Sequence, residues 1–151
     1  SFSLLFARKK GDPAWFIQSL GVLKNFPERG RVLVMEVCSH HCQAEDLGRV
    51  KIPRLFRQMV GARVEFCHSK QLPENPKDWD LVIHCGGCMI SQKAMDARLE
   101  IFRENKIPVL NYGLFLAWVH GLLPRALEPF PGLVDLYEAT PFAAATSCKL
   151  I

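Results

Sequence analysis

Two thiols and an imidazole occur together in the segment His84-Cys85-Gly86-Gly87-Cys88. This segment follows the apolar run Leu81–Ile83 and precedes a helical pattern that begins at Ser91. Reactive residues in α/β proteins gather at such strand-to-helix turns. A second group, Cys38-Ser39-His40-His41-Cys42, follows the apolar run Val32–Val37. Because thiolates and imidazoles are common protein ligands of zinc and iron, the two groups together indicate one metal or redox site.

Four short apolar runs predict the β-strands that position these groups: Arg31–Val37, Arg63–Cys67, Asp80–His84 and Pro108–Asn111. Helical patterns with capping residues are expected to begin at Asp12, Ile52, Ser91 and Leu114. This alternation predicts an α/β fold, with a doubly wound, mostly parallel sheet of about four strands and helices on both faces. In the common doubly wound order the first and third strands are neighbours, so Cys38 and His40 are expected near Cys85 and Cys88.

Composition places the chain among ordinary globular domains. Of 151 residues, 49% are apolar and 23% are charged, which predicts a single domain with its own core. Lys and Arg outnumber Asp and Glu by 19 to 15, but they are scattered, which argues against nucleic-acid binding. The longest apolar stretch, Tyr112–Leu123, is too short and too interrupted to span a membrane. No secretory signal pattern opens the chain, so a cytoplasmic protein is expected.

Six cysteines in a chain of this kind favour metal binding or redox chemistry over a disulfide framework. Cys67 ends an apolar run and is expected to be a small buried hydrophobe. His120 lies in an apolar helical pattern and is expected to be a buried core histidine. Cys42 and Cys148 receive no ligand role from their surroundings in the sequence.

Three kinds of site remain open from the residues alone. A closed zinc site would use Cys38, Cys85 and Cys88 with His40 or His84. An iron-sulfur cluster would use the same three thiolates, and the two glycines favour it, because a close main chain can direct N–H groups at the sulfides. A thiol oxidoreductase would use Cys85 and Cys88 as its redox pair. A zinc-stabilised interaction module and an oxidoreductase are therefore the alternatives to a cluster protein.

At these residues the chain resembles the C-terminal, cluster-binding domain of HydF, the FeFe-hydrogenase maturation GTPase. The resemblance covers most of the chain, in segments that follow one another in order: Ser1–Arg8, Glu36–His41, Asp46–Arg54, Val82–Met89, Pro108–Gly113 and Leu127–Phe130. A lone Cys-x-x-Cys motif is weak support for a family, whereas this ordered series is highly specific.

The resemblance implies a 4Fe-4S cluster on Cys38, Cys85 and Cys88, with a labile fourth ligand for which Glu45, His40 and His84 are the candidates. It implies a scaffold and carrier, without catalytic activity of its own. Such a carrier accepts a diiron precursor, made with two radical-SAM maturases, and delivers it to apo FeFe-hydrogenase. It also implies a homo-oligomer in the full-length protein.

The domain organisation expected from this resemblance is that of a fragment. Residues 1–130 are expected to form the cluster-binding domain of a longer protein, without its GTPase domain, and residues 131–151 a C-terminal tail. The phosphate-binding pattern GxxxxGK[ST] does not occur in the sequence, so no GTP site is expected in this chain.

Overall fold

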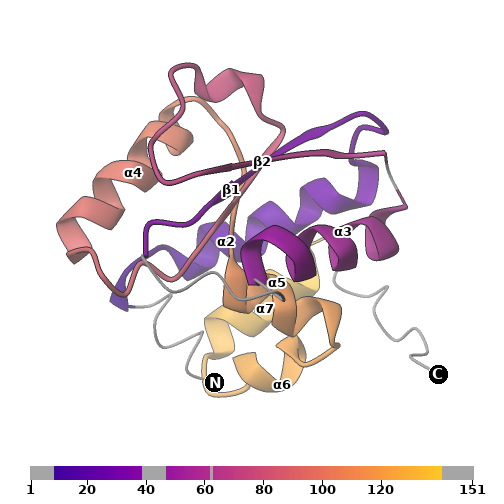
Figure 1. Cartoon of the computed structure of the whole chain (residues 1–151). Helices are drawn as coiled ribbons and strands as arrows, with labels where there is room; N and C mark the ends of the chain where they lie inside the picture. The colour runs from indigo at the N-terminus through magenta and orange to yellow at the C-terminus, as the bar shows by residue number, and fades with distance from the viewer. Residues whose placement is uncertain (1–8, 39–46, 62, 141–151) are drawn as a thin grey trace.

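A computed structural model describes residues 9–38, 47–61 and 63–140 (Figure 1). Short turns of 3-10 or π type occur at Leu20–Asn25, Leu47–Lys51 and Pro76–Asp78. The helices and strands are, in chain order, α2 (Pro13–Ser19), β1 (Arg31–Met35), α3 (Ile52–Val60), β2 (Glu65–Ser69), β3 (Leu81–His84), α4 (Gln92–Glu104), β4 (Val109–Asn111), α5 (Tyr112–Val119), α6 (Leu123–Leu127) and α7 (Pro131–Ala139).

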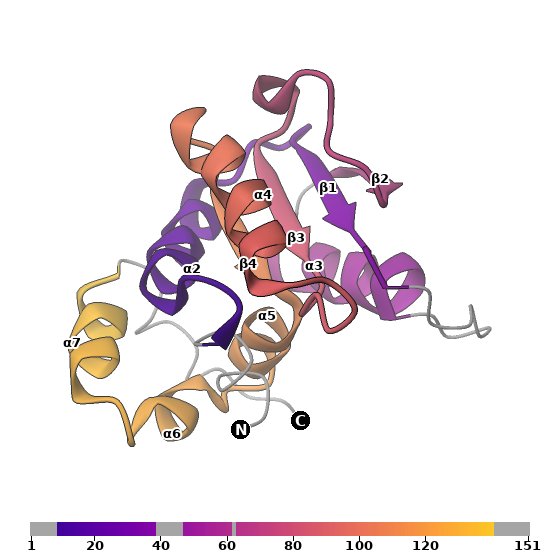
Figure 2. The ribbon, with the colours of Figure 1, turned by 90° about the vertical axis from the view of Figure 1, so that its left-hand side faces the viewer.

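The four strands form one sheet in the order β2-β1-β3-β4, and every neighbouring pair is parallel. In Figure 2, α4 lies in front of the sheet and α3 lies behind it. α5 packs against α3 on that rear face. The predicted α/β class, the strand order and the helices on both faces are therefore confirmed. The strand order in the sheet makes β1 and β3 neighbours, with their carboxyl ends at the same edge.

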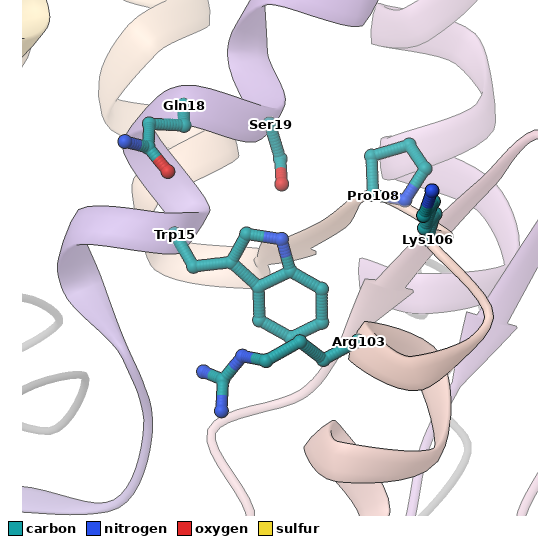
Figure 3. A pocket seen from close by; sticks show the side chains of 6 residues that line it. All are labelled: Trp15, Gln18, Ser19, Arg103, Lys106 and Pro108. Atoms are coloured by element: carbon teal, nitrogen blue, oxygen red, sulfur yellow. The ribbon is translucent and has the colours of Figure 1, made fainter.

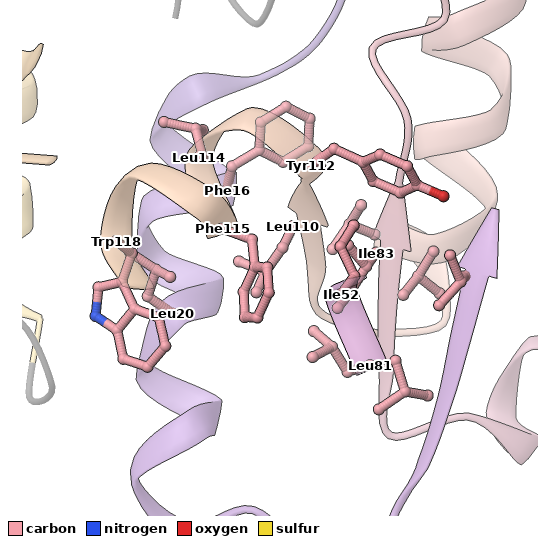
Figure 4. Close-up of a cluster of buried hydrophobic side chains, with 14 of the residues drawn as sticks. Phe16, Leu20, Ile52, Leu81, Ile83, Leu110, Tyr112, Leu114, Phe115 and Trp118 are labelled. Carbon is pink, nitrogen blue, oxygen red and sulfur yellow. The ribbon is translucent and has the colours of Figure 1, made fainter. Parts of the chain in front are cut away.

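The hydrophobic core lies on both sides of the two central strands. All residues of β3 and nearly all of β1 are buried, as expected for strands covered by helices on both faces. Figure 4 shows apolar side chains of β3, β4 and α5 meeting those of α2 and α3. Phe56 of α3 is fully buried and contacts the rings of Phe26 and Phe115, at centroid distances of 5.2 and 6.0 Å. This aromatic packing joins α3 to α5.

Local capping signals in the sequence are realised in the structure. Asp12 accepts a hydrogen bond from the backbone N–H of Trp15, and Pro13 takes the first position of α2. Gly61 ends α3 in the left-handed conformation, with φ of 67°. Ser91 caps α4 by accepting from the N–H of Ala94.

Two expectations about buried residues are wrong. Cys67 is exposed, because β2 is an edge strand and most of its residues remain outside the core. His120 is exposed as well, because α5 ends at Val119 and the histidine is already part of the turn that follows. Each residue lies in an apolar stretch of the sequence. That pattern did not show which part of the strand or helix packs against the core.

Residues at the end of the described chain form a further helix. α7 occupies the first part of the segment 131–151 and packs against both α2 and α6. Among the helices in the described ranges, none has the length and apolar character needed to cross a membrane.

The outer edge of β4 is covered by α2. Ser19, which is 5% exposed, accepts a hydrogen bond from the backbone N–H of Val109 through its hydroxyl oxygen, at 3.2 Å. This N–H belongs to the edge of β4 that faces away from β3, and it would otherwise lie buried without a partner. Ser19 therefore joins the helix to the sheet by satisfying an edge donor.

We expect Ser19→Ala to lower the free energy of unfolding by about 1 to 3 kcal/mol, because it leaves a buried N–H without an acceptor. Urea denaturation of both proteins measures the difference. Gln18→Ala, on the exposed side of the same helix, is the matched control and should change stability by less than about 0.5 kcal/mol. Equal effects of the two substitutions would contradict the role given to the hydroxyl.

Candidate functional site

The pairing of β1 with β3 brings the two thiol segments to one place. Met35 is in register with His84, and the backbone N–H of Cys85 donates to the carbonyl of Met35 at 2.9 Å. The parallel ladder thus continues one residue beyond β3 and sets Cys85 beside the end of β1. Cys38 follows Met35 by three residues in the segment that leaves β1. The positions of both thiols therefore depend on the same ladder.

Three thiols converge at this edge of the sheet. The sulfurs of Cys38 and Cys88 are 3.3 Å apart, and the N–H of Val37 donates to the sulfur of Cys85 at 3.4 Å. A disulfide bond has a length of about 2.05 Å, so these are free thiols in hydrogen-bonding contact. Cys88 contacts Cys38, 50 residues away, which is a pairing that the Cys-x-x-Cys spacing alone did not indicate.

The three thiols have different environments. Cys38 and Cys85 are buried and Cys88 is exposed, so the site is open to solvent on one side. Burial raises the pKa of the Cys38 thiol, but hydrogen bonds from the backbone of Met89 and from the other two thiols outweigh it and lower that pKa. Burial raises the pKa of Cys85. The hydrogen bond between the sulfurs of Cys88 and Cys38 raises the pKa of Cys88. Of the three thiols, only Cys38 has its pKa lowered from the ordinary value.

The two glycines between Cys85 and Cys88 are not equivalent. Gly87 has φ of 62°, in the left-handed region, and a Cβ atom there would overlap the end of the Met95 side chain. Gly86 has neither feature: its φ is not positive, and among the described residues other than its chain neighbours nothing lies within 4 Å of the place where its Cβ would be. The sharp turn thus depends on Gly87 alone.

His84 is held in the interior beside the thiols. Its exposed fraction is 1%, and its Nδ1 lies 2.7 Å from the carbonyl oxygen of Cys85. Because a carbonyl only accepts, Nδ1 carries the proton, and Nε2 is left with a lone pair. Within the described part of the chain, Nε2 has no hydrogen-bond partner. Burial lowers the pKa of His84 to about 4, and the positive charge of Arg98 acts in the same direction, so the ring is neutral near pH 7.

Other residues proposed from the sequence lie outside the described ranges. These are His40 and Glu45, together with Cys42 and Cys148. Within residues 9–38, 47–61 and 63–140, no three or more His, Cys, Asp and Glu side chains form a ready-made metal-binding group. The described thiols are therefore close to one another but are not arranged as a complete coordination sphere.

Sequence reasoning missed Lys10. Residues 85–91, which join β3 to α4, are called the cysteine loop. The Lys10 ammonium donates to three carbonyl oxygens of this loop, those of Gly87, Cys88 and Ile90, at 3.3, 3.2 and 2.8 Å. Lys10 precedes the loop by nearly 80 residues, and no local pattern around it indicates this contact.

A surface hollow of about 360 Å³ lies elsewhere, between α2 and the end of α4. Figure 3 shows its lining, in which the Arg103 side chain extends along the Trp15 ring. The guanidinium lies 4.9 Å from the ring centroid and pairs with Asp12 at 2.6 Å and with Glu100 at 2.9 Å. These contacts join α2 to α4, and the hollow contains none of the thiols.

We expect Gly87→Ala to lower the free energy of unfolding by about 1 to 2 kcal/mol, because alanine is strained in the left-handed conformation. Gly86→Ala is the matched control and should leave stability nearly unchanged. Thermal and urea unfolding of both variants in the metal-free protein provide the measurement. If the two substitutions cost the same, the turn does not depend on the φ of Gly87.

The buried neutral imidazole of His84 predicts a loss of stability in acid. The unfolded chain takes up this proton near pH 6.5, whereas the folded chain does so only near pH 4. The stabilising contribution is therefore fully present above pH 6.5 and decreases as the pH falls to about 4, by roughly 3 kcal/mol in total. Urea unfolding of the metal-free protein across this range measures it. In His84→Asn, whose amide can still donate to Cys85, the slope should be smaller. An unchanged slope would contradict the assignment.

Comparison with known proteins places the chain in a family. Residues 14–129 match the family model of the hydrogen maturase F tetramerization domain. A search of curated proteins found no match. The matched segment contains β1 to β4 and all three thiols of the site. The predicted relation to HydF is confirmed at the level of this domain, which the family description links to tetramer formation rather than to cluster binding. The chain therefore belongs to the HydF tetramerization domain family.

Proposed function

We propose that this HydF-related domain holds a 4Fe-4S cluster on Cys38, Cys85 and Cys88 and, within a homo-oligomer, serves as a carrier in FeFe-hydrogenase maturation. The carrier accepts a diiron precursor, made with two radical-SAM maturases, and delivers it to apo-hydrogenase. The observation that carries the proposal is the convergence of three free thiols from two strand ends inside a HydF family domain.

The donor set suits an iron-sulfur cluster. Clusters of this kind are held by thiolates, and hydrogen bonds to their sulfurs adjust their properties. Main-chain donors already reach the thiols: Val37 and Gly87 donate to Cys85, and Met89 donates to Cys38. The positive end of α4 and the Lys10 ammonium add positive potential near the loop, which favours an anionic group. A bound cluster would supply iron with one position open to an exchangeable ligand.

Three thiolates leave one iron without a cysteine, so a fourth ligand is required. His84 is one candidate, because its Nε2 carries a lone pair and the ring is neutral. His40 and Glu45 remain candidates on the basis of sequence. A histidine or a carboxylate is a harder donor than a thiolate and exchanges more readily at such a site. The exposed position of Cys88 leaves a direction from which an incoming group can approach.

A non-catalytic role fits the domain family. A tetramerization domain brings copies of a chain together, and a bound cluster would then be presented on each copy. Binding and release of a cargo need accessible ligands rather than a substrate cavity. We therefore propose a carrier domain without an enzymatic activity of its own.

One observation favours a second candidate, a thiol redox site. The contact of 3.3 Å between the sulfurs of Cys38 and Cys88, together with the lowered pKa of Cys38, is suited to disulfide formation. The pair would be Cys38 with Cys88, instead of Cys85 with Cys88 as the sequence suggested. A zinc site on the same thiols is the third candidate, and it would stabilise the fold directly.

Cys38→Ser tests these candidates against one another, with Cys67→Ser as the matched control on the exposed edge strand. After anaerobic reconstitution with iron and sulfide, the unchanged chain and the control should bind about four iron ions each and absorb as a 4Fe-4S protein. Cys38→Ser should lose most of this iron and colour. A colourless chain with one tightly bound zinc, or thiol-disulfide exchange activity without iron binding, would overturn the cluster proposal.

A further inference from the structure

Lys10 holds the outer side of the cysteine loop. Its ammonium has three N–H donors, and three carbonyl oxygens of the loop accept from it, those of Gly87, Cys88 and Ile90. The Gly87 carbonyl also accepts from the N–H of Ile90, at 3.2 Å, which closes the turn. One side chain thus fixes three peptide groups in the segment between Gly87 and Ser91. Lys10 lies before the segment 14–129 that matches the family model.

Peptide geometry connects these carbonyls to the thiols. In a trans peptide the C=O and N–H bonds point in opposite directions. When the carbonyls of Gly87 and Cys88 face Lys10, the N–H groups of Cys88 and Met89 therefore face away from it. These are the two backbone donors that reach the sulfur of Cys38. The ammonium and the thiol thus bind opposite ends of the same two peptide groups.

The charge of Lys10 acts in the same direction as its hydrogen bonds. A cation at the carbonyl end polarises a peptide and makes its N–H a stronger donor. The ammonium is also close enough to Cys88 for its positive charge to favour that thiolate directly. Both effects increase the positive potential at the place where three thiolates would meet.

We infer that Lys10 is a positioning residue of the thiol site: it orients the Gly87–Met89 peptides so that their N–H groups face the Cys38 sulfur, and its charge raises the reduction potential of a cluster bound there. The orientation of the peptides is a property of the metal-free chain. The effect on the potential rests on the proposed function, because it requires a bound cluster.

The first experiment uses the metal-free chain and compares Lys10→Met with the unchanged chain and with Lys9→Met. Lys9 is the exposed neighbour, so its substitution removes the same charge without touching the loop. Amide hydrogen exchange, followed by NMR, should be about ten-fold or more faster for Cys88 and Met89 in Lys10→Met only. Lys10→Arg keeps a donor and a charge and should restore most of the protection. Exchange that is unchanged in Lys10→Met would overturn the orienting role.

The second experiment measures the reduction potential of the reconstituted cluster in the same variants. Removing a nearby positive charge disfavours the reduced form, so the potential should be more negative in Lys10→Met than in Lys9→Met, with Lys10→Arg close to the unchanged chain. Equal potentials in both Met variants would overturn the electrostatic role. If the unchanged chain takes up no cluster, the proposed function fails, whereas the exchange experiment still decides the orienting role.

Discussion

The parallel pairing of β1 with β3 is the interaction on which the site depends. It sets Met35 beside His84 and continues by one further hydrogen bond, from Cys85 to the Met35 carbonyl. Cys38 and Cys85 belong to segments 47 residues apart, counted as 85 − 38, and only this ladder makes them neighbours. The ladder is stable because helices cover both faces of the two strands and bury nearly all of their side chains. The aromatic contacts of Phe56 and the edge contact of Ser19 therefore support the thiols from a distance, by keeping the sheet intact.

The loop between β3 and α4 is held in its conformation by three features. Gly87 supplies the left-handed turn, Ser91 starts α4, and Lys10 holds the carbonyls on the outer side. These contacts leave backbone N–H groups facing the sulfurs, so the main chain itself lines the site. Such donors stabilise negative charge without bringing a second charged side chain into the interior. A group with several sulfur atoms uses this lining more fully than a single metal ion does.

The three thiols differ in their burial, and therefore in how each could hold or expose a bound group. Cys85 is buried and bound by its backbone to the end of β1, the pKa of Cys38 is lowered by hydrogen bonds, and Cys88 lies at the surface. A site built in this way keeps a bound group attached to the sheet while one side remains reachable. That combination suits a domain that receives and passes on a cargo. The chain belongs to a family described as a tetramerization domain, and assembly of its copies would bring several such sites into one particle.

Apolar periodicity and capping residues predicted the helices and strands and their order, because both act over a few neighbouring positions. Asp12 and Ser91 began helices as their types predicted, and the doubly wound order implied that Cys38 would lie near Cys85. Only the tertiary structure showed that Cys67 is exposed, that Gly87 and not Gly86 makes the turn, and that Cys38 pairs with Cys88. It also revealed the contact of Lys10 with the loop. These features depend on which distant segments meet at one edge of the sheet. The local spacing of residues does not indicate which segments those are.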